Sequence, residues 1–195
     1  MPRKATTKQR KKIDVLFQFR IALLEIKPPI WRRIQVPDCS LGQFHRYIQD
    51  AFGWDESHLH EFEVDGQRIG PSDDDGFGLD EVIDEMDVRL SDLIDGSAKK
   101  VRWIYTYDFG DDWRHEILFE GSPPVDPEVS YPQCVDGKRA CPPEDCGGTW
   151  GYVDLVAAIS DKKHERHEEM LEWIGEFDPE EFDPKKATRA MSGKR

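Results

Sequence analysis

The sequence lacks the features of a membrane or exported protein. It contains no run of about 18 consecutive apolar residues, the length that a helix needs to cross a bilayer. Its first twelve residues are basic and polar and contain no apolar signal core. Four cysteines in 195 residues, without such a signal, are typical of free thiols in a reducing compartment. We therefore expect a cytoplasmic protein that makes no contact with membranes.

Positive charge is scarce in the middle of the chain. The sequence carries 27 Lys and Arg against 40 Asp and Glu, a formal net charge of −13. Six of the basic residues lie in residues 1–12 and five in residues 185–195, and neither segment contains an acid. The acidic body between them would repel a phosphate backbone. We expect two disordered basic tails and contact with nucleic acid only through those tails. For the body we expect a protein or peptide partner, and a basic partner would suit its acidic charge.

Common catalytic signatures are also missing. No G-x-x-x-x-G-K-[ST], G-x-G-x-x-G or G-x-S-x-G string occurs. The sequence therefore contains no motif that indicates a nucleotide-binding site or the nucleophile elbow of a hydrolase. The composition, with 37% hydrophobic and 11% aromatic residues, is nevertheless that of a chain able to bury a core. We expect one domain over residues 13–184.

The first half alternates in the manner of strands. Apolar residues recur at every second position over 13–26, Pro28-Pro29 interrupts the pattern, and residues 30–36 form another β-prone run. These features predict an antiparallel pair. Ser40 and Gln43 then have the spacing of a capping box, and the helical apolar pattern that follows stops at Gly53.

Two further hairpins are predicted. Residues 58–65 and 67–69 flank the turn dipeptide Asp65-Gly66. Residues 70–79 form a loop, and residues 88–94 one or two helical turns. The second hairpin turns at residues 110–112, and we expect one aromatic-rich buried face made of Val101, Trp103, Tyr105, Tyr107, Phe109, Trp113, His115, Ile117 and Phe119.

The C-terminal third predicts a long irregular stretch followed by helices. Residues 121–151 are too rich in Pro and Gly to be regular over most of their length, whereas residues 152–159 and 164–174 have helical patterns. Together the segments predict an α+β fold, a single domain with a mixed or antiparallel β-sheet and packed helices.

Three cysteines suggest a metal site but do not complete one. Cys134, Cys141 and Cys146 are spaced C-x6-C and C-x4-C, and a tetrahedral zinc site needs four donors. A fourth could come from His58, His60 or His115. The paired C-x2-C knuckles of a zinc ribbon are absent, which favours reduced, packed thiols. We expect no cofactor and leave structural zinc open. His58 and His60 are predicted to project from the same side of a strand.

Four ordered stretches resemble a known family. They are PPIWRRI at 28–34, FGW with HLHEF at 52–62, YTYDFGDDW with His115 at 105–115, and GKRACPPEDCGG with Gly-Tyr at 137–152. Together they resemble the plasmid pRiA4b ORF-3-like family, often labelled as insertion-element passenger proteins of resolvase type. The resemblance implies a single α+β domain without an established activity. The resolvase label fits poorly, because the acidic body lacks the Arg-rich surroundings of a recombinase serine.

These stretches contain more polar and aromatic residues than a core needs. We predict that the hairpin tip 108–113 and the loop 137–148 meet over the strand bearing His58 and His60. The predicted binding groove consists of Trp31, Arg33, His60, Tyr107, Asp108, Asp112, Trp113, Glu144 and Asp145.

The favoured function is a non-catalytic interaction module of a mobile-element or bacterial cytoplasmic protein. The alternative is a metal-dependent hydrolase or nuclease-like enzyme that uses His58, His60 and Asp108, with Cys residues as further ligands. The oligomeric state stays open.

Overall fold

A computed structural model describes residues 13–72, 82–94 and 101–193. The strands are β1 (Leu16–Leu23), β2 (Trp31–Pro37), β3 (His60–Val64), β4 (Gln67–Gly70), β5 (Ile83–Asp84), β6 (Arg102–Tyr107), β7 (Trp113–Gly121) and β8 (Gln133–Lys138). The helices are α1 (Leu41–Phe52), α2 (Leu90–Leu93), α3 (Gly148–Ser160), α4 (His167–Ile174) and α5 (Pro184–Met191). The predicted N-terminal tail and most of the 70–79 loop lie outside the described residues.

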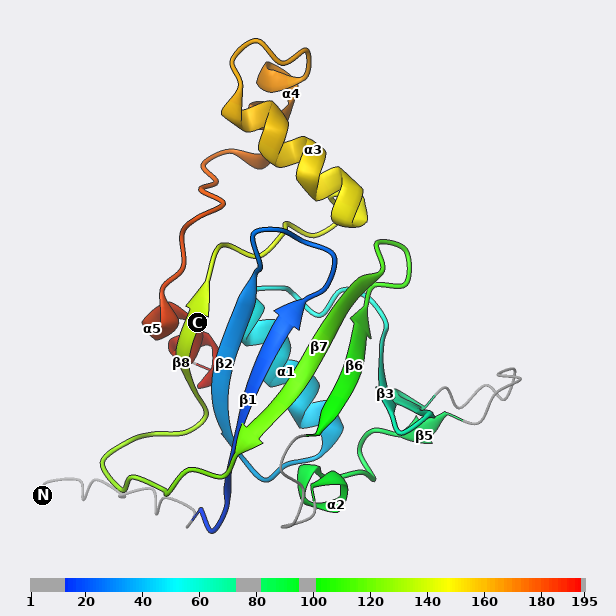
Figure 1. Ribbon diagram of the computed structural model, residues 1–195, viewed down its shortest axis with the longest axis vertical. Coiled ribbons are helices and arrows are strands. Elements are labelled where there is room, and N and C mark those ends of the chain that lie inside the picture. Colours follow the sequence, from blue (N-terminus) through cyan, green and yellow to red (C-terminus); the bar gives the residue numbers. More distant parts are fainter. Residues whose placement is uncertain (1–12, 73–81, 95–100, 194–195) are drawn as a thin grey trace, which may run out of the picture.

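The strands of the described residues form one mixed sheet. Its order is β5-β4-β3-β6-β7-β1-β2-β8, and its neighbours pair antiparallel except β4 and β5, which are parallel. Figure 1 shows α1 lying across one face of this sheet. The predicted α+β class with a mixed or antiparallel sheet is therefore confirmed.

Local sequence signals explain most of these elements. β1 and β2 pair across the Pro28-Pro29 interruption, with Phe19 opposite Ile34. The Ser40 side chain accepts a hydrogen bond from the Gln43 N–H at the start of α1, and Gly53 ends the helix with a φ of 96°.

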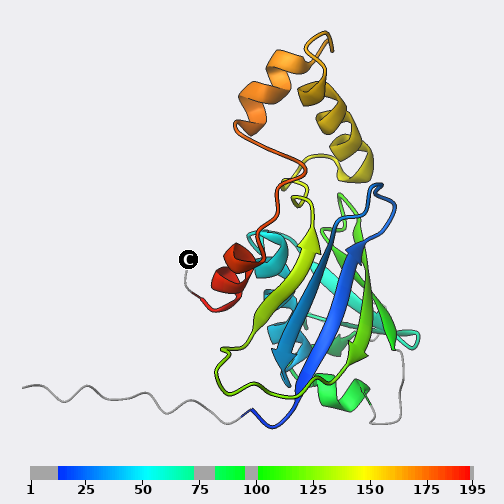
Figure 2. The same cartoon turned by 60° about the vertical axis from the view of Figure 1, so that its left-hand side comes forward.

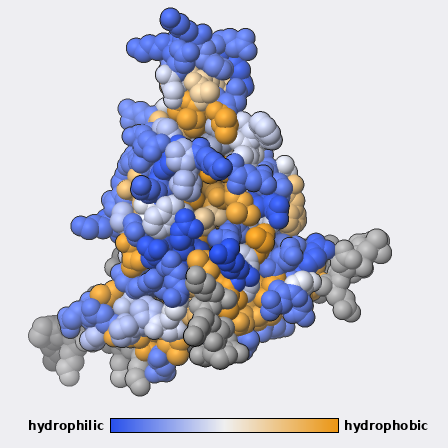
Figure 3. All heavy atoms as spheres, viewed as in Figure 1, coloured by the Kyte–Doolittle hydropathy of each residue, from blue (hydrophilic) through white to orange (hydrophobic). Residues whose placement is uncertain are grey.

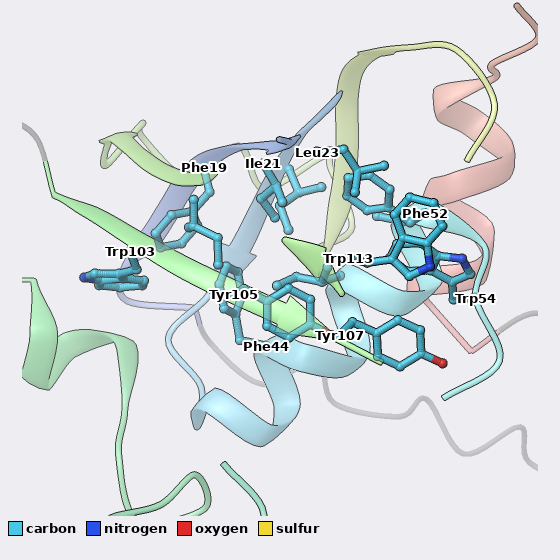
Figure 4. Close-up of a cluster of buried hydrophobic side chains, with 14 of the residues drawn as sticks. Phe19, Ile21, Leu23, Phe44, Phe52, Trp54, Trp103, Tyr105, Tyr107 and Trp113 are labelled. Carbon is cyan, nitrogen blue, oxygen red and sulfur yellow. The ribbon is translucent and has the colours of Figure 1, made fainter. Parts of the chain in front are cut away.

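The core lies between the sheet and α1 and is rich in aromatic rings. Figure 4 shows side chains of β1, β6 and β7 packed against Phe44 and Phe52 of α1. Phe19 and Phe44 have ring centroids 4.8 Å apart. At one side of this cluster the Tyr107 ring directs its hydroxyl oxygen away from the other rings. One prediction for this face is wrong: Phe109 is 53% exposed, because it lies beyond the end of β6 where strand alternation no longer applies.

One C-terminal strand was not predicted, and one C-terminal prediction is wrong. Residues 133–138 form β8 on the edge of the sheet beside β2, within the stretch expected to be mainly irregular. Residues 184–191 form α5 and not a disordered tail. Asp183 caps this helix by accepting the Lys185 N–H, Pro184 occupies its first turn, and Ala187 and Met191 are buried.

The helices α3 and α4 form a hairpin that projects beyond one end of the sheet (Figure 1, Figure 2). Trp150, at the beginning of α3, is 88% exposed. No helix within the described ranges has the length and apolar character to cross a membrane.

Candidate functional site

The turn between β6 and β7 lies against the loop that precedes α3. Asp111 Oδ2 accepts a hydrogen bond of 3.1 Å from the Gly147 N–H. Gly148 has a φ of +65°, and a Cβ there would overlap the backbone carbonyl of Asp111, so the contact requires glycine. The Trp54 indole N–H donates to the Pro142 carbonyl at 3.0 Å and ties the same loop to the end of α1. The hairpin tip and the loop, which the sequence predicted to meet, therefore do lie in contact.

At this contact one imidazole lies among three carboxylates. His58 Nε2 is 3.2 Å from Asp145 Oδ1, 3.7 Å from Asp108 Oδ2 and 3.9 Å from Glu144 Oε2. We call these four residues the His58 cluster. His58, Asp108 and Asp145 each offer one ligand atom, and the three atoms lie within 4.8 Å of one another. The cluster thus combines donors that divalent ions accept.

Within the described ranges, hydrogen bonds hold two of the carboxylates through one oxygen each. Asp108 Oδ1 accepts the Gly110 N–H at 2.9 Å and the Asp111 N–H at 3.3 Å. Glu144 Oε1 accepts the Tyr107 hydroxyl and the Asp55 N–H, both at 3.0 Å. The other oxygen of each group points toward His58.

The electrostatic environment of the cluster is strongly negative. Within the described residues, the only ion-pair partner of Asp108, Glu144 and Asp145 is His58. Tyr107 lies beside Glu144, and burial, followed by the hydrogen bond to that carboxylate, raises the pKa of the phenol above its usual value. The phenol therefore stays protonated and remains a donor.

His60 occupies a different environment. Its Nε2 lies 2.6 Å from Glu85 Oε2, and its ring stacks on that of His45 with centroids 3.4 Å apart. Tyr105 in turn holds His45 Nδ1 at 2.8 Å. His58 and His60 therefore do not converge, and the alternative enzyme retains only His58 and Asp108 of its three predicted residues.

The predicted cysteine ligands are not gathered with the histidines. In the part of the chain that the structure describes, the His58 cluster supplies the only group of three or more His, Cys, Asp or Glu donors close enough to share an ion. Cys134 Sγ lies 3.4 Å from the Asp136 carbonyl. Burial raises the pKa of Cys134 to about 11 and that of Cys146 to about 12, and it raises the pKa of Cys141 as well. These thiols are therefore neutral packed groups at neutral pH.

His115 belongs to the core. It is fully buried, and its Nδ1 lies 3.0 Å from the Trp113 carbonyl. Burial lowers the pKa of the imidazole to about 3, an effect that the nearby Arg32 charge reinforces and the carbonyl contacts oppose. His115 is therefore a neutral core residue and not a ligand beside His58.

Other members of the predicted groove lie apart from the cluster. Arg33 projects from the sheet face opposite α1, where it pairs with Glu120 at 2.6 Å and lies 5.3 Å from the Trp31 ring. Figure 3 shows this face, on which hydrophilic residues surround scattered hydrophobic patches. Trp113 is buried in the core, and Asp112 is exposed at the hairpin turn.

A separate pocket lies between the end of α1, the loop at 140–141 and residues 176–190. Its volume is about 340 Å³. Its lining includes three aromatic rings and seven charged residues, namely Phe52, Phe177, Phe182, Arg32, Asp50, Glu176, Asp178, Glu181, Asp183 and Lys186. We call it the α5 pocket.

Arg32 lies at the base of the α5 pocket and is 1% exposed. Its guanidinium donates to the carbonyls of Ala51 and Trp31, both at 2.9 Å, and of Lys138 at 3.0 Å. The Phe182 ring covers it at 3.9 Å. Burial lowers the pKa of this guanidinium below its usual value. Three carbonyl dipoles therefore balance a buried positive charge.

The sequence-based site omitted Arg32 and the 176–190 wall of this pocket. A signal for Arg32 exists, because it occupies an inward position of β2 between Ile30 and Ile34. The sequence pattern of residues 176–190 gives weaker evidence for a pocket lining, because the segment beyond Pro184 carries mainly basic and small residues.

Comparisons with known proteins agree with the fold. The model of a family described as plasmid pRiA4b ORF-3-like protein matches residues 15–186. The relative named Uncharacterized protein y4hQ, from Sinorhizobium fredii (strain NBRC 101917 / NGR234), is 39% identical over 162 residues, which cover 83% of this chain and 81% of the relative. The resemblance predicted from the four motifs is confirmed.

A solved structure has the same architecture. It is the crystal structure of a protein of unknown function, MM3350 from Methanosarcina mazei Go1. The match has a TM-score of 0.80 and 38% sequence identity, and it covers 89% of this chain and 98% of the other. At this similarity the shared fold extends over nearly the whole of the solved chain.

Proposed function

The chain belongs to the plasmid pRiA4b ORF-3-like family, and for this member we propose a non-catalytic role as an interaction module. Its partner is a protein with a basic segment, and the α5 pocket receives that segment. The proposal keeps the acidic, aromatic-lined character expected from the sequence but moves the groove from the hairpin tip 108–113 to the α5 pocket.

The charge balance of the α5 pocket carries this proposal. Five carboxylates line it against two cations. Arg32 is engaged by three backbone carbonyls, and Lys186 is paired with Glu181 at 2.7 Å. A basic guest would therefore enter a negative environment, whereas an anionic guest would meet repulsion.

The rings of the α5 pocket suit the same guest. The Arg32 guanidinium already lies 4.8 Å from the centroid of Phe52 and 3.9 Å from that of Phe182. Aromatic faces attract cations and stack well on the planar guanidinium. Phe177 lines the pocket near its acidic residues, so an arginine of the partner could combine ring contact with a carboxylate contact.

The test is a binding titration with a basic probe. A fluorescein-labelled nonapeptide of alternating Arg and Gly is titrated with the full chain, and fluorescence anisotropy reports binding. The pocket variant combines Glu176→Gln and Asp178→Asn, where Asn keeps the oxygen that accepts the Glu180 N–H. Removing two charges should weaken binding about fivefold, or about 1 kcal/mol.

The matched control removes two carboxylates elsewhere. Glu168→Gln with Glu172→Gln changes the net charge equally on the exposed surface of α4. We expect this control to bind the probe within about twofold of the unmodified chain. Equal weakening of both variants, or no saturable binding by the unmodified chain, contradicts the proposal.

A further inference from the structure

We propose that the His58 cluster binds one divalent transition-metal ion, with Zn²⁺ as the best match to its donors. The ligands are His58 Nε2, Asp108 Oδ2, Asp145 Oδ1 and Glu144 Oε2. This site is separate from the α5 pocket and does not depend on the partner proposed for it.

The first argument is the spacing of the donor atoms. Two ligands that each lie about 2.1 Å from a tetrahedral zinc ion are about 3.4 Å apart. The three carboxylate oxygens lie 3.2, 3.7 and 3.9 Å from His58 Nε2. His58, Asp108 and Asp145 therefore offer three donor atoms within 4.8 Å of one another, and Glu144 Oε2, 3.9 Å from His58 Nε2, completes the set after a movement of its side chain.

The second argument is a set of buried oxygens without donors. Glu144 Oε2 is buried and has no hydrogen-bond partner among the described residues. The Asp108 side chain is 9% exposed, and the same part of the chain offers its Oδ2 only the long contact to His58. A buried carboxylate oxygen loses its hydration and needs compensation. Both oxygens face the point where an ion would lie.

The third argument is the way in which the ligands are oriented. Backbone N–H groups of Gly110 and Asp111 hold one oxygen of Asp108, and the Tyr107 hydroxyl holds one oxygen of Glu144. Such outer contacts orient metal ligands in known sites and tune their affinity. Asp145, 74% exposed on its side chain, supplies a ligand from the open side, where an ion could enter.

The fourth argument is charge. Three carboxylates surround one imidazole, and Arg and Lys side chains among the described residues form no ion pair with them. A singly charged imidazolium would balance at most one of three negative charges. A divalent ion balances two and accepts the imidazole as a neutral ligand.

The experiment measures metal binding by the full chain. The protein is stripped with a chelator and dialysed, and ZnCl₂ is titrated into it by isothermal calorimetry. We expect one equivalent to bind saturably. His58→Gln removes a side chain that is 29% exposed and makes an edge contact of 5.9 Å with the Tyr107 ring, and Asp145→Asn alters a side chain that is 74% exposed. Both variants should therefore fold, and each should weaken binding by at least about tenfold.

The experiment also includes a matched control variant and a variant that tests the cysteines as an alternative metal site. His164→Gln removes an imidazole on the α3–α4 hairpin, far along the chain from the cluster, and should leave zinc affinity unchanged. Absence of saturable zinc binding by the unmodified chain overturns the proposal. Loss of binding in Cys141→Ser with Cys146→Ser but not in His58→Gln also overturns it, because the ion would then lie at the thiols.

Discussion

His58 and His60 are two residues apart and have opposite surroundings. The His60 ring is buried, with Glu85 at 2.6 Å and the His45 ring stacked at 3.4 Å. The His58 ring is 29% exposed and faces three carboxylates at 3.2–3.9 Å. The His60 ring makes its contacts with buried groups of the fold. The His58 ring, in contrast, could give up a contact with a carboxylate and bind a ligand. Neighbouring elements, and not spacing along the chain, decide which histidine is structural.

The difference has a simple geometric cause. Residues two apart share a side only within a strand, and β3 begins at His60. His60 is paired in register with Tyr107, so its ring is directed into the core. His58 precedes the strand and lies at the level of the β6–β7 turn, where Asp108 is located.

The largest effect expected from a single substitution at neutral pH tests the structural role of His60. His60→Leu leaves the Glu85 carboxylate buried without its partner, which should lower the free energy of unfolding by about 3 kcal/mol. His58→Gln should change it by less than about 0.5 kcal/mol. Urea unfolding followed by tryptophan fluorescence measures both. Equal losses would remove the distinction between the two histidines.

The next effect is a pH dependence that arises in the core. Burial, with a contribution from the charges of His60 and Arg46, lowers the pKa of His45 to about 3, and burial lowers that of His115 to about 3, from 6.5 in both cases. Below pH 6.5 the unfolded chain binds protons that the folded chain excludes. Stability should therefore fall as the pH decreases from 6.5 toward 3, by about 1.4 kcal/mol per pH unit for each histidine.

Urea unfolding between pH 6.5 and 4 measures this slope. His115→Asn keeps a polar side chain near the Trp113 carbonyl but removes the titrating ring. The slope for this variant should be smaller by about 1.4 kcal/mol per pH unit. Identical slopes for the variant and the unmodified chain would show that His115 does not titrate as its burial requires.

A smaller effect concerns the hydroxyl that orients Glu144. Tyr107→Phe removes the bond to Glu144 Oε1 and the acceptor of the Ser57 N–H, which should cost about 1 kcal/mol of stability. It should also weaken zinc binding about tenfold, because Glu144 loses one of the two hydrogen bonds that orient it and keeps only the bond from the Asp55 N–H. Calorimetry and urea unfolding measure the two effects. Tyr131→Phe, whose hydroxyl accepts the Asp126 N–H in another loop, is the control and should leave zinc binding unchanged.

Sequence patterns predicted those elements whose burial follows a regular period. Alternation in β1 and β7 and the Ser40 cap of α1 were sufficient, because each is a local signal. β8 was missed because QCVDGK lacks that alternation, and it forms through pairing with β2. α5 was missed because only Ala187 and Met191 of its basic sequence are buried.

The candidate site was predicted in part for the same reason. Four predicted residues do lie together, namely Tyr107, Asp108, Glu144 and Asp145. This part of the site could be predicted because the sequence shows both the tight turn and the Pro-rich loop that carry them. Trp31 and Arg33 were included in the predicted groove because they belong to one of the four family motifs, and no sequence signal indicated where in the fold they lie. The face of a strand on which they lie becomes known only when the sheet is assembled.

The most direct test observes the imidazole rings themselves. The chain contains six histidines, and long-range proton–nitrogen spectra of ¹⁵N-histidine-labelled protein show each ring separately. Addition of one equivalent of ZnCl₂ should move the ring signals of His58, identified by their loss in His58→Gln, and leave those of His60 and His115 in place. Zinc-dependent shifts of His60 or His115 without any change at His58 would contradict the account.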